Sequence, residues 1–237
     1  MIAITGANGH LGQLVVERLL EEIPANQIIA AVRAPENASR FAKIGVQVRK
    51  ADYSHPETLS TALYGGKRLL LISASEVGRK FKLHKAVIDA AKKKGVELLV
   101  YTSLLRADSS EMLLASEHRQ TEEYLQASGL PFVVLRNGWY LENHTSTIEK
   151  AIENGALVGC SKGGRFASAS RADYAAAAVT VLTQPVSGSK ISELAGDQSF
   201  SFVNRSTISR SKPLGTSDGR KRTILLIDTT SIEIRIK

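Results

Sequence analysis

Three glycines near the start of the chain have the type and spacing that bind a phosphate group. Gly6, Gly9 and Gly12 follow a short apolar run at residues 2–5 and precede apolar residues at helical spacing. Glycines in such a strand-to-helix turn allow a tight bend, and the first helical N–H groups attract an anion. The G-x-x-G-x-x-G spacing is typical of extended dehydrogenases and predicts a nicotinamide dinucleotide site. The expected contacts come from Gly6, Ala7, Asn8, Gly9, His10 and Leu11.

Arg33 stands at the end of a second apolar run, residues 28–33. In dinucleotide-binding folds this position lies beside the adenosine ribose, where an acidic residue binds the 2′-hydroxyl and a basic one meets a 2′-phosphate. A guanidinium binds phosphate through paired hydrogen bonds. Arg33 therefore predicts NADP(H), with NAD(H) as the alternative cofactor and a solvated surface arginine as the alternative reading of the residue.

Further candidates follow later apolar runs, at the strand ends where ligands of open α/β sheets bind. They are Asp52 and Tyr53, expected along the adenine ring, then Ser73, Ala74 and Ser75, and finally Asn137, Gly138, Trp139 and Tyr140. The small side chains at residues 73–75 would let the backbone approach the phosphates and the nicotinamide ribose. Trp139 and Tyr140 would form an aromatic wall beside the nicotinamide, unless they are core aromatics with satisfied polar tips.

The sequence lacks an obvious proton donor. No lysine stands four residues after a tyrosine, so the Tyr-x-x-x-Lys pair of conventional short-chain dehydrogenases is missing. Where that pair would sit is His118, a candidate donor for which a surface or ribose-contacting position is favoured. The single cysteine, Cys160, and the absence of metal-ligand spacing indicate chemistry without a metal. We assign no residue a catalytic role.

Composition narrows the class of protein. The chain has 237 residues, 43% of them hydrophobic, and a net charge of +8. The basic excess is concentrated in residues 198–237 without aromatic–basic interleaving, which argues against nucleic-acid binding. No apolar run approaches the roughly 20 residues that span a bilayer, and the N-terminus enters a strand without a leader. The cytoplasm is the expected compartment.

Strand-like and helix-like segments alternate along the chain, which predicts an α/β fold with a doubly wound parallel sheet, the NAD(P)-binding Rossmann fold. The expected strands are residues 2–5, 28–33, 46–51, 68–73, 98–103 and 132–137. The expected helices are residues 13–22, 38–43, 57–63, 83–94 and 112–128. A short helix at 146–154, a strand at 156–159 and a helix at 172–182 follow. Residues 224–237 alternate like an isolated strand with no assignable place in the sheet.

Several blocks of the sequence closely resemble the NmrA-like family of atypical short-chain dehydrogenase/reductases, in particular its quinone reductase branch. They are residues 5–12, 51–53, 69–78, 101–105, 135–140 and 171–178, with Arg33, Glu142 and Asn143. The resemblance implies an oxidoreductase that passes hydride from NADPH to quinones or similar conjugated electrophiles, and it allows for a homodimer. It also implies that Trp139, Tyr140 and Asn143 border the substrate. A quinone needs positioning more than acid catalysis, which suits the missing proton donor.

The resemblance covers residues 1–197, which we interpret as a Rossmann domain with part of a substrate lobe. Residues 198–237 form an atypical basic tail rich in serine and threonine, interpreted as a frameshifted or truncated reading frame. The C-terminal substrate lobe is therefore expected to be small and incomplete. Two alternatives remain open: an NADP(H)-sensing regulator without turnover, and an inactive truncated copy of the reductase.

Overall fold

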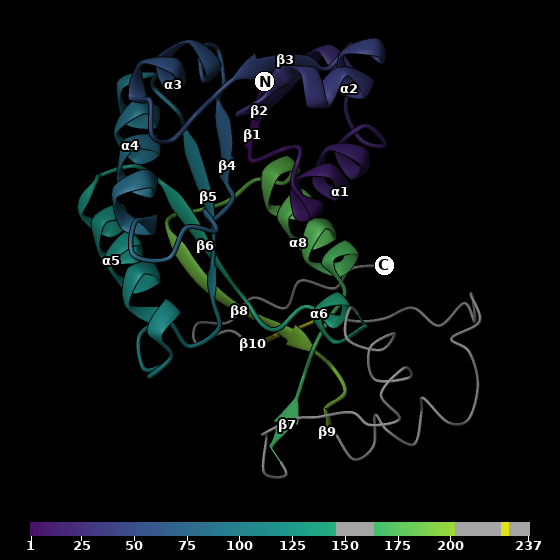
Figure 1. The fold of residues 1–237 in the computed structure, drawn as a ribbon, viewed down its shortest axis with the longest axis vertical. Helices are drawn as coiled ribbons and strands as arrows, with labels where there is room; N and C mark the ends of the chain where they lie inside the picture. Colours follow the sequence, from purple (N-terminus) through teal and green to yellow (C-terminus); the bar gives the residue numbers. More distant parts are fainter. Residues whose placement is uncertain (146–163, 202–223, 228–237) are drawn as a thin grey trace.

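A central sheet organises the computed structural model, which describes residues 1–145, 164–201 and 224–227. The sheet has eight strands in the order β10-β8-β6-β5-β4-β1-β2-β3 (Figure 1). Their bounds are β1 (Ile2–Thr5), β2 (Ile28–Val32), β3 (Gln47–Lys50), β4 (Arg68–Leu71), β5 (Leu98–Leu104), β6 (Phe132–Asn137), β8 (Lys190–Gly196) and β10 (Ile224–Ile227). All neighbouring pairs are parallel except β10 with β8. The predicted doubly wound α/β fold is confirmed.

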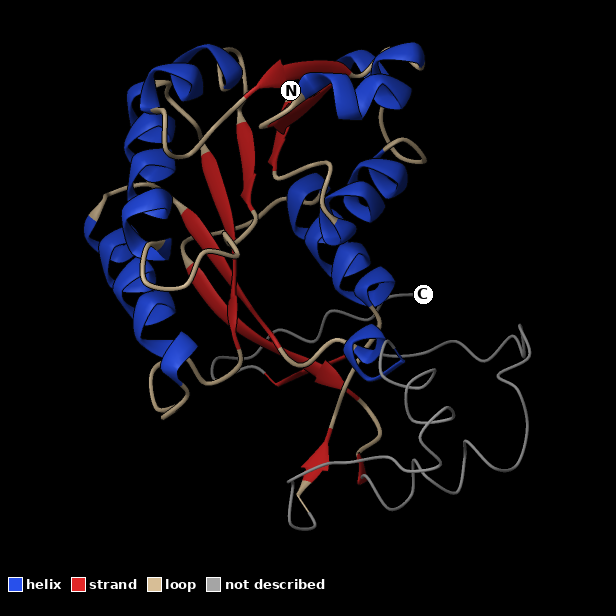
Figure 2. Ribbon diagram, viewed as in Figure 1, coloured by secondary structure: helices blue, strands red, loops and turns tan. Residues whose placement is uncertain are grey.

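Helices cover both faces of the sheet, as Figure 2 shows. On one face lie α1 (His10–Leu19) and α8 (Arg171–Thr183), and on the other lie α3 (Pro56–Ala62), α4 (Lys80–Lys93) and α5 (Leu113–Ala127). Shorter elements are α2 (Ser39–Lys43), α6 (Leu141–Thr145), the 3-10 helices η1 (Ala25–Gln27) and η2 (Pro35–Ala38), and the antiparallel pair β7 (Arg165–Phe166) and β9 (Phe200–Ser201).

The sheet is buried on both faces, which explains its nearly continuous apolar strands. Strands β1, β2 and β6 are buried along their whole length. The buried residues form one cluster on each side of the sheet. Val15 of α1 and Leu182 of α8 belong to one cluster, and Leu59 of α3 and Leu125 of α5 belong to the other.

Two helices begin at positions that bear on the candidate site. Helix α8 begins at Arg171 because Ser170 and Asp173 form a capping box, in which each side chain accepts from the other's backbone N–H. Helix α1 begins at His10, directly after Gly9, rather than at residue 13 as predicted. The glycine turn therefore leads straight into the helix, which brings the helix N-terminus to the end of β1.

The structure assigns the C-terminal strand a place in the sheet, which the sequence pattern leaves open. Residues Ile224–Ile227 pair antiparallel with β8, from Ile224 opposite Gly196 to Ile227 opposite Glu193. The strand thus belongs to the sheet rather than standing alone. The predicted helix at 146–154 and strand at 156–159 lie outside the described residues. Within the described residues, no helix has the length and hydropathy to span a bilayer.

Candidate functional site

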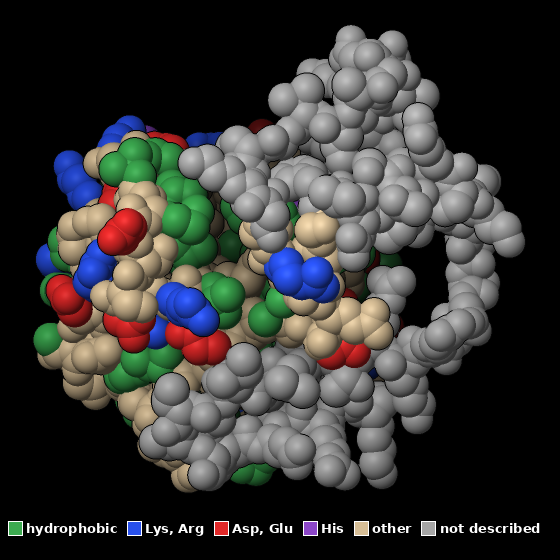
Figure 3. Space-filling view, turned by 90° about the horizontal axis from the view of Figure 1, so that it is seen from below, with side chains coloured by type: hydrophobic (Ala, Val, Ile, Leu, Met, Phe, Trp, Pro, Cys, Tyr) green, Lys and Arg blue, Asp and Glu red, His purple; other side chains and the backbone are tan. Residues whose placement is uncertain are grey.

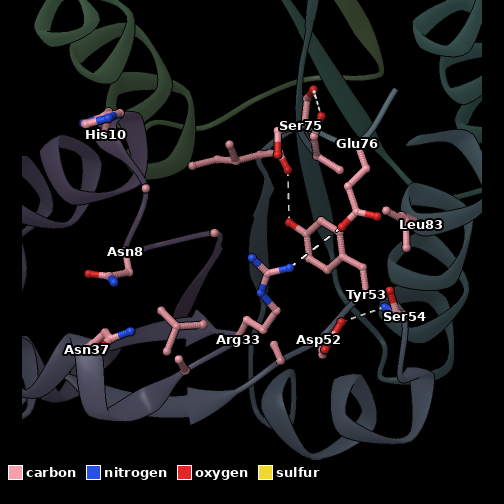
Figure 4. A pocket seen from close by; sticks show the side chains of 18 residues that line it. Asn8, His10, Arg33, Asn37, Asp52, Tyr53, Ser54, Ser75, Glu76 and Leu83 are labelled. Carbon is pink, nitrogen blue, oxygen red and sulfur yellow. Dashed lines mark hydrogen bonds and ion pairs between the residues drawn. The ribbon is translucent and has the colours of Figure 1, made fainter. Parts of the chain in front are cut away.

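A cavity of about 550 Å³ opens where β1, β2, β3 and β4 end (Figure 4). The glycine turn, the ends of β2 and β3 and the loop after β4 form its walls. Its lining residues are Gly6, Asn8, Gly9, His10, Val32, Arg33, Ala34, Asn37, Ala51, Asp52, Tyr53, Ser54, Ile72, Ser73, Ala74, Ser75, Glu76 and Leu83. Much of the predicted cofactor site is therefore gathered around one hollow at the carboxyl edge of the sheet.

The glycine turn is tight enough to require its glycines. Gly6 has φ +62°, a left-handed conformation that favours glycine. A Cβ on Gly12 would lie 2.3 Å from the Gly6 carbonyl oxygen and 2.7 Å from the Ala7 Cα, so helix and turn are in direct backbone contact. The Gly9 N–H donates to the Gly6 carbonyl. The next N–H groups of α1 have no acceptor within the helix and can face an anion.

Two residues of the turn differ from the others in how they could contact a ligand. The side chains of Ala7 and Leu11 are buried in the core at 0% and 6% exposure. Neither lines the cavity. Any contact from them to a cofactor would therefore come through backbone N–H groups, which is how a helix N-terminus binds phosphate.

Arg33 and Glu76 form an ion pair at the cavity (Figure 4). The Arg33 Nη1 lies 3.8 Å from the Glu76 Oε1, and the Arg33 side chain is 75% exposed. Glu76 also pairs with Arg79 at 3.3 Å. Exposed ion pairs contribute little free energy, so an anionic ligand group can compete for Arg33 while Glu76 keeps Arg79.

Tyr53 forms a fixed wall of the cavity. Its hydroxyl donates to the Thr5 Oγ1 over 2.6 Å and also lies 3.0 Å from the Ile72 carbonyl oxygen. Burial raises the pKa of Tyr53, so it stays protonated and acts as a surface rather than a base. The neighbouring Asp52 has a lowered pKa. Partial burial raises this pKa, but the hydrogen bonds from Ser54 and His55 lower it by more.

Two N–H groups of the segment after β4 are hydrogen-bonded inside the protein. The Ser73 N–H donates to the Thr102 Oγ1 over 3.0 Å, and the Ala74 N–H donates to the His84 Nε2 over 2.8 Å. With these N–H groups used inside the protein, the polar side chains that the segment brings to the cavity lining are those of Ser73 and Ser75. A hydroxyl can both donate and accept, so these side chains can bind the hydroxyls of a ribose or the amide of a carboxamide.

The predicted site residues at and after the end of β6 lie apart from the lining of this cavity. Tyr140 packs against Tyr174, with ring centroids 5.3 Å apart, and under the Arg171 guanidinium. Arg171 also donates to the Asn143 Oδ1 over 2.9 Å, so the predicted substrate residues Tyr140 and Asn143 are held together by one arginine. Asn137, Gly138, Trp139 and Tyr140 are absent from the lining. Their contact with cofactor or substrate stays a prediction.

Trp139 is 46% exposed. Met112, directly before α5, is 47% exposed, and Leu113, the first residue of α5, is 81% exposed. Figure 3 shows that hydrophobic side chains gather in patches between charged ones on the described part of the face seen from below. Trp139 is therefore not a core aromatic, the alternative that the sequence left open for it.

The expected surface position of His118 is wrong. Its side chain is 5% exposed, and its Nδ1 lies 2.7 Å from the hydroxyl of Tyr101, which is itself buried. Burial, with the nearby Lys80 charge, lowers the pKa of His118 to about 4. Burial, together with His118 and Lys80, lowers the pKa of His84 to about 3. Both rings are neutral at pH 7.

These neutral histidines predict a loss of stability in mild acid. Their folded pKa values lie below the ordinary 6.5, so the unfolded chain binds protons that the folded chain does not. Their contribution is fully present above pH 6.5 and falls as the pH decreases. Between pH 6 and 5 we expect the free energy of unfolding to drop by about 2 kcal/mol for the pair, measured by urea denaturation.

The control is His118→Asn, whose amide oxygen can accept from Tyr101 in place of the Nδ1. It should reduce this pH dependence by about half, because one of the two titrating rings is gone. An unchanged slope between pH 6 and 5 would show that His118 is not the source.

Sequence reasoning missed several residues of the cavity. Asn37 lies in η2 and Glu76 in the loop after β4, where no spacing rule marks a ligand contact. In the sequence, Leu83 fits only the apolar spacing of a helix. The one available signal was position, because Glu76 directly follows the predicted segment 73–75. Among the described residues, no group of three His, Cys, Asp or Glu side chains could hold a metal ion.

The chain is similar to known proteins that bind nicotinamide dinucleotides. A model of the NAD(P)H-binding family matches residues 6–185. Quinone oxidoreductase 2 of Escherichia coli (strain K12) is 49% identical over 203 residues, which span 86% of this chain and 71% of that protein. The NmrA-like family domain-containing oxidoreductase flvB of Aspergillus flavus is 34% identical over 188 residues, 76% of this chain and 61% of that protein.

Solved structures of similar proteins have the same fold. The NADPH complex of the E. coli NADPH-dependent quinone oxidoreductase QOR2 superimposes with a TM-score of 0.85 at 47% identity, covering 88% of this chain and 74% of that one. The NADP(H) complex of Citrobacter sp. triphenylmethane reductase gives a TM-score of 0.84 at 37% identity, covering 87% and 74%. Both similar proteins were crystallised with the phosphorylated dinucleotide.

Proposed function

Because the chain belongs to the NmrA-like NAD(P)H-binding family, we propose that it is an NADPH-dependent oxidoreductase that reduces quinones or similar conjugated electrophiles. The observation that carries the proposal is the common cavity of the glycine turn and Arg33. The glycine turn leaves no room for a Cβ at Gly12, and the helix N-terminus beside it suits a pyrophosphate. Arg33 suits a 2′-phosphate. The residues present therefore fit NADP(H).

In this mechanism the residues of the chain bind and orient. The turn residues Gly6 to Leu11 would hold the pyrophosphate, Arg33 the 2′-phosphate, and residues 73–75 the nicotinamide half. Bound NADPH supplies the hydride. Trp139, Tyr140 and Asn143 are proposed to border the acceptor, with Asn137 and Gly138 supporting the cofactor. Tyr53 is held by Thr5 and keeps its proton, so the chain contributes positioning and leaves protonation of the product to solvent.

The test is NADPH oxidation with a simple benzoquinone, with NADPH binding measured on the same sample. We expect binding and quinone-dependent turnover. Tight binding without turnover would instead support the alternative of an NADP(H)-sensing regulator or an inactive copy. The division at residue 197, the cytoplasmic location and the homodimer remain predictions, and light scattering after size-exclusion chromatography tests the last of them.

Exchanging Arg33 for aspartate should reverse the cofactor preference. Arg33→Asp removes the cation that would meet the 2′-phosphate and adds a carboxylate that can accept from a 2′-hydroxyl. We expect the NADPH Kd to rise about tenfold and NADH binding to improve relative to NADPH. The matched control is Arg79→Asp, which removes the other cation that pairs with Glu76 but does not line the cavity. An unchanged NADPH preference in Arg33→Asp would remove Arg33 from the site.

A further inference from the structure

We propose that His84 is a positioning residue for the cofactor, acting through the backbone of Ala74. The inference rests on the proposed function, since it concerns the same cavity. His84 lies in α4, is 0% exposed and does not line the cavity, whereas Ala74 does. The His84 Nε2 accepts the Ala74 N–H over 2.8 Å and so fixes the middle of the segment at residues 73–75.

The proton positions around His84 follow from its partners. The Ala74 N–H can only donate, so the His84 Nε2 must carry a lone pair and the ring proton must be on Nδ1. The Nδ1 lies 3.0 Å from the Thr121 Oγ1, which donates its own hydrogen to the Glu117 carbonyl over 2.8 Å. Thr121 therefore accepts from His84. The hydrogen bonds therefore all run in one direction, from the Ala74 N–H at the cavity wall through His84 to Thr121 in α5.

A second buried ring supports the same arrangement. The Tyr101 hydroxyl lies 2.7 Å from the His118 Nδ1 and 3.3 Å from the His84 Nδ1. Because the His84 Nδ1 carries its proton, Tyr101 can donate to His118 and hold the two rings in place. The charge of Lys80, which is 7% exposed, acts on both histidines, and Glu117 acts on His118 in the opposite sense. Burial, then His118 and Lys80, keep the pKa of His84 at about 3, so the accepting nitrogen persists through the neutral range.

The hydrogen bond from Ala74 to His84 helps to fix the cavity wall at residues 73–75. The Ala74 N–H is bonded to His84 and the Ser73 N–H to Thr102. These two hydrogen bonds to residues outside the cavity lining fix the orientation of the peptide planes in this segment. Loss of the His84 acceptor would leave the Ala74 N–H without a partner and free that peptide plane to rotate. The half of the site that receives the nicotinamide ribose would lose its shape, while the Arg33 end would keep its own.

The experiment compares His84→Gln with His84→Asn. A glutamine amide oxygen reaches the position of the Nε2 and can accept from Ala74, whereas an asparagine oxygen stops at the position of the Nδ1. We expect the NADPH Kd to rise about tenfold in His84→Asn and to stay within about threefold in His84→Gln. The Kd for 2′,5′-ADP, a fragment that reaches only the Arg33 end, should change less than twofold in both variants.

Equal losses for NADPH and 2′,5′-ADP, or equal NADPH affinities in the two variants, would overturn the proposal. A measurement on the unaltered protein keeps it testable if the variants do not fold. Nitrogen NMR of the His84 ring should show the tautomer protonated on Nδ1, and an Nε2-protonated ring would contradict the assignment. Failure of the proposed function would appear separately, as an unaltered protein that binds NADPH but does not oxidise it with benzoquinone.

Discussion

Replacing Gly12 with alanine is expected to weaken NADPH binding about a hundredfold. The added Cβ would lie 2.3 Å from the Gly6 carbonyl oxygen and 2.7 Å from the Ala7 Cα. Both are backbone atoms, so the turn and the start of α1 must move apart, and the N–H groups that would face the pyrophosphate move with them. The change is measured as the NADPH Kd by isothermal titration calorimetry.

The matched control is alanine at Gly95, which precedes β5 at the opposite edge of the sheet. Gly95 has φ +68° and no atom within 4 Å of an added Cβ, so the variant strains the backbone without a clash. It should cost about 1 kcal/mol of stability and leave NADPH binding unchanged. If Gly12→Ala bound NADPH as the unaltered protein does, the turn would not be the phosphate site.

Replacing Arg136 with methionine is expected to lower the free energy of unfolding by about 3–5 kcal/mol. Arg136 lies in β6 and contacts three carboxylates: Glu122 at 2.7 Å, Glu193 at 2.8 Å and Asp108 at 2.9 Å. The Glu122 side chain is 4% exposed and also accepts from Ser103, so without Arg136 a buried carboxylate would lose its counter-charge. Urea denaturation measures the loss.

Two further variants distinguish the buried ion pair of Arg136 with Glu122 from its exposed ion pair with Asp108. Adding Glu122→Gln to Arg136→Met should recover part of the stability, because the buried charge is then gone as well. Asp108→Asn should cost less than about 1 kcal/mol, since the Asp108 side chain is 64% exposed. Similar losses for Asp108→Asn and Arg136→Met would mean that burial of Glu122 does not govern the effect.

The strands could be predicted well because their signal is local. Buried parallel strands consist of continuous apolar runs, and β6 has the bounds expected from the sequence, Phe132–Asn137. Helix starts were predicted less well. Helix α1 begins at His10 and α4 at Lys80, each three residues before the apolar periodicity. In α1 the close packing of Gly12 against Ala7 sets the start of the helix, and helix propensity does not predict such a contact.

The candidate site was predictable where spacing carries the chemistry, as in the glycine turn, and where a strand end does, as at Arg33. Residues that reach the cavity only through the folded structure could not be predicted. Glu76 and Asn37 reach the cavity through loop and 3-10 geometry, and His84 reaches it only through a backbone bond. The alternating pattern after residue 223 indicated a strand, but pairing with β8 depends on contacts between residues far apart in the sequence.

The packing of α8 against α1 has a consequence for how the chain is made. The two helices lie side by side (Figure 1) and share one hydrophobic cluster, although α1 ends at Leu19 and α8 begins only at Arg171. During synthesis, the apolar face of β1, β2 and α1 has no cover from α8 until that helix has left the ribosome. Contacts between segments so distant in the sequence form slowly, and until they form, hydrophobic surface that favours aggregation stays exposed. The hydrophobic cluster that includes α1 is therefore covered only after α8, the last described helix, has been synthesised.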